Sequence, residues 1–257
     1  MSQFDNQYAA SHARAQQGAV VDEGLRSYML GVYNYMAMGV ALTGVVAYVV
    51  YTMMVTTDQS QAVVALKNGT MLTQLGHALM ISPLKWVVML APLGFILVMS
   101  FARMSAANAQ MVFWAFAAVM GVSLSSIFVV YNLGSIAQIF FITAAAFASL
   151  SLYGYTTKKD LSGWGSFLIM GLVGIIIAGL VNIFLQSSAL QFAISAIGVL
   201  VFAGLTAYDT QRIKDEYYVV AGDQEAMARA SIFGALTLYL DFVNLFMMLL
   251  SLFGDRE

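Results

Sequence analysis

Long apolar segments alternate with short polar ones along most of the chain. Seven segments are long enough to cross a bilayer as a helix, which takes about 20 mostly apolar residues. They cover residues 28–55, 79–102, 108–131, 135–156, 164–186, 188–208 and 231–253. The pattern predicts an all-α membrane protein with seven transmembrane helices. The joint between the fifth and sixth segments, near residues 186–188, is short, so six spans are the alternative.

The composition supports a location in the membrane. Hydrophobic residues make up 61% of the chain and charged residues 9%, whereas a soluble domain has roughly 45–50% apolar and about 25% charged residues. A soluble fold is therefore excluded. The net charge of -2 argues against binding to the phosphate backbone of nucleic acid. The absence of cysteine excludes disulfides and thiolate metal sites.

Residues 1–27 lack the apolar stretch and the small-residue cleavage site of a secretory signal. They are polar and carry charged side chains such as Arg14, Asp22 and Glu23. We predict that this segment is a flexible polar tail and that residues 28–257 form one transmembrane domain, with the first span as an uncleaved signal anchor.

Lysine and arginine are distributed unevenly between the two sides of a seven-span chain. One side receives Arg14, Arg26, Arg103, Lys158, Lys159, Arg212, Lys214 and Arg229, and the other receives Lys67, Lys85 and Arg256. Because cytoplasmic loops accumulate positive charge, we predict a cytoplasmic N-terminus and an external C-terminus. Merging the fifth and sixth segments would spoil this asymmetry, so the charges also favour seven spans.

An aspartate in the last apolar segment is the strongest candidate for function. Asp241 lies about ten residues into the segment with no charged neighbour on its own helix, which at ~1.5 Å per residue places it about 15 Å deep. A carboxylate there costs roughly 2.5–3.5 kcal/mol on insertion scales and is a functional candidate by default. The alternative is a protonated or salt-bridged aspartate that only holds helices together.

A second aspartate, Asp209, closes the sixth segment, where a negative charge opposes the dipole of the helix. The alternative is a solvated residue paired with Arg212 one turn further on. Arg103 ends the second segment on the same predicted side. Most arginines in such positions are topology anchors, but a guanidinium that reached an aspartate pair could hold a closed state through a charge-assisted fork.

The sequence lacks the groups that common enzymes of the membrane use. Neither His12 nor His77 falls within a predicted span, so no histidine-based metal cluster or proton relay is expected in the bilayer. No Gly-x-Ser-x-Gly motif of a serine hydrolase occurs. We predict that the protein is not an enzyme and has no cofactor.

Three longer motifs carry a resemblance to a known family. They are Gly204-Leu-Thr-Ala-Tyr-Asp-Thr-Gln211, Gly234-Ala-Leu-Thr-Leu-Tyr-Leu-Asp-Phe-Val-Asn-Leu-Phe246 and Ser151-Leu-Tyr-Gly-Tyr-Thr-Thr-Lys-Lys-Asp160. With them the chain resembles the bacterial branch of the transmembrane Bax inhibitor motif family over essentially its whole length after the tail. The resemblance implies seven helices with the seventh at the centre, in the bacterial inner membrane.

The family is known for a calcium leak that depends on pH. The resemblance implies that Asp209 and Asp241 form a hydrogen-bonded pair that senses pH and binds calcium weakly, and that Arg103 is the latch of the closed state. Two nearby carboxylates in a low dielectric cannot both ionise cheaply and are expected to share a proton. The implied partners are the lipid bilayer, protons and calcium ions, with calcium as the transported ion.

Two alternative functions are compatible with membrane-embedded aspartates or with the family. An intramembrane aspartyl protease also needs two aspartates on adjacent helices, but Asp241 follows Leu-Tyr-Leu rather than Gly-x-Gly, and no Pro-Ala-Leu motif occurs. The other alternative is a non-conducting modulator of a membrane-anchored protease or of another membrane assembly. Calcium flux in reconstituted liposomes separates conduction from modulation.

Overall fold

The computed structural model describes residues 3–66, 69–102 and 104–256, with side chains from residue 23 onward. Its helices are α1 (Gln3–Met54), α2 (Gln74–Met80), α3 (Leu84–Phe101), α4 (Ala106–Leu124), α5 (Ile127–Val130), α6 (Leu133–Thr156), α7 (Ser162–Leu185), α8 (Ser188–Val220) and α9 (Gln224–Phe253). Its short strands are β1 (Val55–Thr56), β2 (Val64–Ala65) and β3 (Met71–Leu72).

Within the described ranges, seven helical segments are long and apolar enough to cross a bilayer. They are Glu23–Met54, Leu84–Phe101, Ala106–Val130, Leu133–Thr156, Ser162–Leu185, Ser188–Val220 and Gln224–Phe253. The prediction of a helical bundle with seven segments of spanning length is confirmed. Large apolar side chains such as Val87, Leu97, Phe167 and Met170 point outward from α3 and α7, as expected for helices that meet lipid. The chain is an integral membrane protein.

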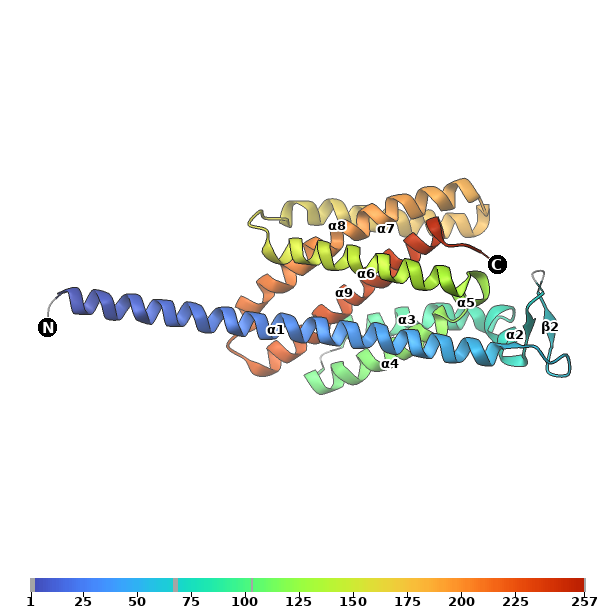
Figure 1. The fold of residues 1–257 in the computed structure, drawn as a ribbon, viewed down its shortest axis with the longest axis horizontal. Coiled ribbons are helices and arrows are strands. Elements are labelled where there is room, and N and C mark those ends of the chain that lie inside the picture. The colour runs from blue at the N-terminus through green and yellow to red at the C-terminus, as the bar shows by residue number, and fades with distance from the viewer. Residues whose placement is uncertain (1–2, 67–68, 103, 257) are drawn as a thin grey trace.

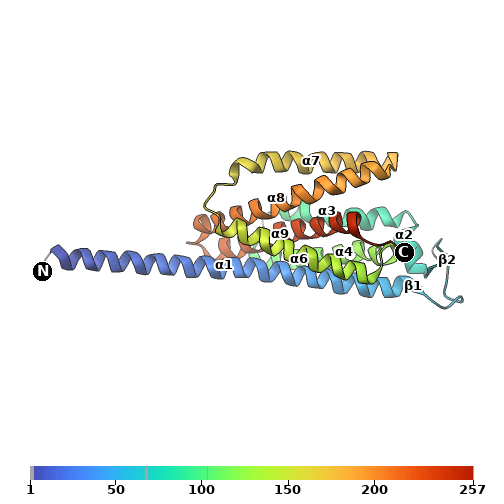
Figure 2. The same ribbon diagram turned by 45° about the horizontal axis from the view of Figure 1, so that its top comes forward.

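The seventh span, α9, lies in the middle of the bundle (Figures 1 and 2). It packs against α8, α1, α6 and α4 and is the most buried of the seven spans. Two apolar clusters meet on it. Tyr239 and Phe242 belong to the cluster shared with α1 and α4, whereas Leu245 and Leu250 belong to the cluster shared with α6, α7 and α8.

The last two spans are longer than the apolar pattern predicts. α8 continues to Val220 instead of ending near residue 208, and α9 begins at Gln224 instead of near residue 231. The stretch after Asp209 is polar overall, but Ile213 and Tyr217 recur at helical spacing and are buried, so the helix continues as an amphipathic one. The prediction that Asp209 closes its helix is wrong, and the argument from the helix dipole does not apply.

The two ends of α1 also differ from the simple pattern. Its backbone is helical from Gln3, so the helix runs through the segment predicted as a polar tail; the flexibility of residues 1–27 stays a prediction. The polar connection after α1 forms a small antiparallel sheet in the order β1-β3-β2. Thr73 then caps α2 by accepting a hydrogen bond from the Gly76 backbone N–H at 3.2 Å.

Most of the described basic residues belong to one end of the bundle. In Figure 1 the α6–α7 connection, with Lys158 and Lys159, and the α8–α9 turn lie toward the N-terminus of α1. The sheet, α2 and the C-terminus lie at the other end, together with Lys85 at the start of α3. For the described basic residues, the two predicted sides of the membrane thus correspond to the two ends of the bundle. Which of these ends faces the cytoplasm stays a prediction.

Candidate functional site

Asp209 of α8 and Asp241 of α9 lie together in the interior of the bundle. The two residues are 6% and 5% exposed, and their carboxyl groups are within hydrogen-bonding distance of each other. Both are more than two helical turns from the ends of their helices. Because a carboxylate has no hydrogen to donate, a hydrogen bond between the two groups requires that one of them carry a proton. The structure therefore brings the two predicted residues into contact.

One described cation reaches this pair from α8. Nη2 of Arg212 lies 2.8 Å from Oδ1 of Asp209, and its guanidinium carbon lies 5.8 Å from the centre of the Tyr208 ring. The Arg212 side chain is 51% exposed and the Asp209 side chain 8%, so the ion pair crosses from the interior to the surface. Oδ2 of Asp241 is buried without a hydrogen-bond partner among the described residues. A cation thus contacts the Asp209 side of the pair, whereas Oδ2 on the Asp241 side has no bonded partner among the described residues.

A cavity of about 670 Å³ lies between α8 and α9 beside Arg212. Its lining includes Arg212, Asp215, Glu216 and Thr237. Thr237 is one turn before Asp241 on α9, and Arg212 is bound to Asp209, so two lining residues are neighbours of the pair, whereas neither aspartate lines the cavity itself. Asp215 and Glu216 are exposed and give the cavity two acidic side chains. The cavity thus combines these charged side chains with apolar ones such as Val219, Val220 and Phe233.

Aromatic rings pack around α9 beyond the pair. The ring centre of Phe242, the residue after Asp241, lies 5.5 Å from the ring centres of both Phe140 and Phe147 of α6, in edge-to-face geometry. Phe140 also lies 6.2 Å from Phe246. Edge-to-face contacts at these separations are favourable. Phe242, which follows Asp241 in the chain, thus joins α9 to α6 through aromatic contacts.

Close helix packing positions the backbone around Asp209. Gly154 of α6 lies directly on the backbone carbonyl of Ala207, two residues before Asp209, and leaves no room for a Cβ. One turn earlier on α6, the Ser151 hydroxyl lies 2.9 Å from the Thr210 hydroxyl and 2.6 Å from the Tyr33 hydroxyl of α1. Hydrogen bonds and close packing thus join three helices next to the aspartate.

We expect Gly154→Ala to destabilise the protein. The new methyl group would press on the α8 backbone, which cannot rotate away as a side chain can, and overpacking of this kind costs about 1–3 kcal/mol. Gly174→Ala of α7 is the matched control, because a Cβ there meets nothing within 4 Å. Thermal unfolding of the detergent-solubilised variants measures the difference, and equal midpoints for the two would contradict this account of the helix contact.

A family model described as Inhibitor of apoptosis-promoting Bax1 matches residues 25–257, a range that contains both aspartates and Arg212. The chain belongs to this family. It is 45% identical over 259 residues to a protein of Caulobacter vibrioides, with 100% of both chains covered. It is 44% identical over 235 residues to the inner membrane protein YbhL of Escherichia coli, with 91% of this chain and 94% of the relative covered. The resemblance found in the motifs is confirmed.

The third predicted site residue, Arg103, lies outside the described residues, so its part as a latch stays a prediction. Within the described part of the chain, no cluster of three or more histidine, aspartate or glutamate residues could hold a metal ion. Calcium takes about six to eight oxygen ligands. The weak binding of calcium by Asp209 and Asp241 therefore stays a prediction.

The sequence signals Arg212 as a partner of Asp209, but it signals neither the burial of Asp209 nor the other contacts between the helices. The sequence leaves Arg212 as the partner of a solvated Asp209, whereas Asp209 is buried and touches Asp241 as well. Thr43 of α1 lies 2.7 Å from the Tyr239 hydroxyl of α9 and donates to the Ala117 carbonyl of α4 at 2.8 Å. Such contacts join segments far apart in the chain, and neither periodicity nor a local motif marks them.

Proposed function

We propose that this protein is a pH-gated cation leak, with calcium as the transported ion, in which the aspartate pair senses protons and Arg212 holds the closed state. The observation that carries the proposal is the buried contact between two carboxyl groups in the middle of two membrane helices, with one arginine bound to it. Ionisable groups inside a bilayer are costly and mark ion and proton pathways. Membership of the family supports the same function, because the resemblance implies a pH-dependent calcium leak.

Proton uptake is the proposed gating event. While Asp209 is ionised, its carboxylate attracts the Arg212 guanidinium and keeps it beside the pair. When Asp209 takes up a proton, this attraction is lost, and the half-exposed arginine can turn toward Asp215 and Glu216, which line the same cavity. The leak is therefore expected to rise as the pH falls.

The proposed ion path begins at the acidic cavity and passes the aspartate pair. Asp215 and Glu216 raise the local concentration of cations, and the pair supplies the oxygen ligands that calcium prefers. Beyond it, the rings of Phe140, Phe147 and Phe242 form an apolar barrier that must separate for ions to pass, because apolar constrictions exclude water. Two carboxylates bind calcium weakly, which suits passage rather than storage.

We place the protein in the bacterial inner membrane, the location that the name of the Escherichia coli relative gives for that protein. The basic end of the bundle faces the cytoplasm in this proposal, because positively charged loops are retained there. A reporter that is active only in the cytoplasm should then be inactive when fused to the C-terminus. Strong activity of this fusion would mean that the chain is inverted.

Calcium flux into liposomes that contain the purified protein and a calcium-sensitive dye tests the proposed function. Flux should be higher at about pH 6 than at about pH 8, because proton uptake by the pair is the proposed gating event. Protein-free liposomes prepared in the same way are the control. Flux at the protein-free level at every pH would overturn the leak and favour the alternative of a non-conducting modulator of a membrane-anchored protease.

A further inference from the structure

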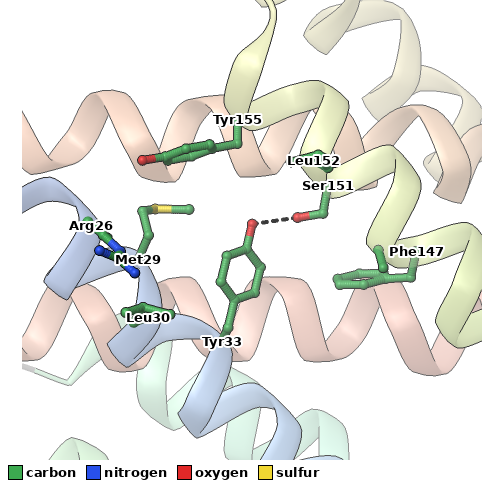
Figure 3. A pocket seen from close by; sticks show the side chains of 9 residues that line it. Arg26, Met29, Leu30, Tyr33, Phe147, Ser151, Leu152 and Tyr155 are labelled. Carbon is green, nitrogen blue, oxygen red and sulfur yellow. Dashed lines mark hydrogen bonds between the residues drawn. The ribbon is translucent and has the colours of Figure 1, made fainter. Parts of the chain in front are cut away.

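A groove between α1 and α6 opens on the side of the bundle, as Figure 3 shows. Its volume is about 470 Å³, within the roughly 300–1,000 Å³ of known small-molecule sites. α1 packs mainly against α4 and α9, whereas α6 packs mainly against α8 and α9, so the two helices stand apart on either side of the groove. Met29 and Leu30 form one wall, and Phe147 and Leu152 the other.

Two hydroxyl groups inside the groove, those of Tyr33 and Ser151, are hydrogen-bonded to each other. The Tyr33 hydroxyl points across the groove to the Ser151 hydroxyl at 2.6 Å (Figure 3). Ser151 is in turn 2.9 Å from the Thr210 hydroxyl, which donates to the Thr206 carbonyl at 2.7 Å. A ligand in the groove therefore meets mainly hydrocarbon and aromatic surface, which matches an acyl chain better than a polar metabolite.

Arg26 is the cation that lines one end of the groove, and Lys214 of α8 contacts the lining residue Tyr155 without lining the groove itself. Arg26 lies two residues before the apolar stretch of α1, which begins at residue 28. Tyr155 lines the same end, and Nζ of Lys214 lies 2.9 Å from its carbonyl oxygen and 5.6 Å from the centre of its ring. At ~1.5 Å rise per residue, α1 descends about 10 Å between Arg26 and Tyr33. The groove thus runs from a positively charged rim into an apolar interior.

We propose that this groove binds one phospholipid with an anionic headgroup, whose phosphate lies at Arg26 and whose acyl chain lies between α1 and α6. The charge of the rim decides the headgroup, because a guanidinium binds phosphate oxygens through charge-assisted hydrogen bonds. Basic pockets between membrane helices at the cytoplasmic side are known to hold anionic headgroups. This site is separate from the aspartate pair, and it does not depend on the proposed leak.

Photo-crosslinking locates the lipid. The full-length protein is placed in phosphatidylcholine bilayers that contain a phosphatidylglycerol probe with a photoreactive acyl chain, and the crosslinked peptides are mapped by mass spectrometry. Crosslinks should concentrate in residues 26–33 and 147–155, and unlabelled phosphatidylglycerol should compete better than added phosphatidylcholine. Crosslinks spread evenly over the lipid-facing surfaces of α3 and α7, or equal competition by the two lipids, would overturn the proposal.

Two variants with matched controls test the rim and the groove separately. Arg26→Ala should lower crosslinking about fivefold, the effect of one basic residue on binding to anionic lipid, whereas Lys158→Ala, an exposed lysine outside the lining, should have little effect. Ala148→Trp fills the groove and should reduce crosslinking, whereas Ala145→Trp, at an exposed position of the same helix outside the lining, should not. Equal losses within either pair of variants would also overturn the proposal.

Discussion

Replacing Asp241 by asparagine is expected to remove most of the acid-stimulated calcium flux, lowering it about tenfold or more. The asparagine amide can donate a hydrogen bond to Asp209 without any bound proton, so the ion pair between Asp209 and Arg212 persists when the pH falls. A hydrogen bond to a charged group contributes roughly 1.5–3 kcal/mol, which corresponds to about tenfold or more in an equilibrium. Proteoliposome flux between about pH 6 and about pH 8 measures the loss.

Asn244→Ala is the matched control for this substitution. Asn244 lies one turn further along α9, and its side-chain amide donates to the Leu240 carbonyl of the same helix at 2.8 Å. Its removal takes no ionisable group out of the bilayer, so the pH dependence of the flux should stay like that of the parent. Equal losses in the two variants, at equal thermal stability, would mean that altered packing and not the carboxyl group is responsible.

Arg212→Ala is expected to raise the leak at neutral pH and to flatten its dependence on pH. The substitution leaves the buried Asp209 carboxylate without its cation, which disfavours the closed state. Removing a partner from a buried pair costs roughly 3–5 kcal/mol, whereas an exposed pair contributes about 0.2–1 kcal/mol. Because the Arg212 side chain is 51% exposed, we expect about 1–2 kcal/mol, or roughly 5- to 30-fold more flux.

Three further substitutions decide whether the effect is specific. Arg229→Ala removes an exposed arginine at the same end of the bundle and should leave the flux unchanged. Arg212→Lys should restore the parent behaviour only in part, because an ammonium lacks the planar fork of a guanidinium. Arg103→Ala tests the latch that the resemblance implies. If Arg103→Ala opens the leak and Arg212→Ala does not, Arg103 holds the closed state and the assignment of Arg212 is wrong.

The seven spans could be predicted from the sequence because the bilayer imposes a minimum length of apolar helix, and each segment meets it by itself. The end of the sixth span could not be predicted in this way. Residues 210–218 are too polar on average to count as membrane helix, and only the burial of Ile213 and Tyr217 against other helices shows why α8 continues. A measure averaged over a window loses this alternation between a buried face and an exposed face.

The contact between the two aspartates depends on geometry that no single helix contains. Counted from the turn between α8 and α9, Asp241 lies more than one helical turn further away than Asp209. Whether two such residues meet depends on how the helices tilt and approach. The approach is set by contacts such as Gly234, where a Cβ would come 3.0 Å from a methyl carbon of Ile213. The sequence identifies both aspartates and Gly234, but it does not show which residues of the other helices they contact.

The central position of α9 has a consequence for biogenesis. The helix that touches four of the other spans is the last of the seven to leave the ribosome, although chains generally begin to fold from their N-terminal parts during synthesis. The first six spans must therefore enter the bilayer before α9, the helix that packs between them, has been made. Until then Asp209 of α8 lacks its contact with Asp241. Assembly of the bundle is completed only after translation of α9, so a nascent chain stalled before it should be a ready substrate for membrane quality control.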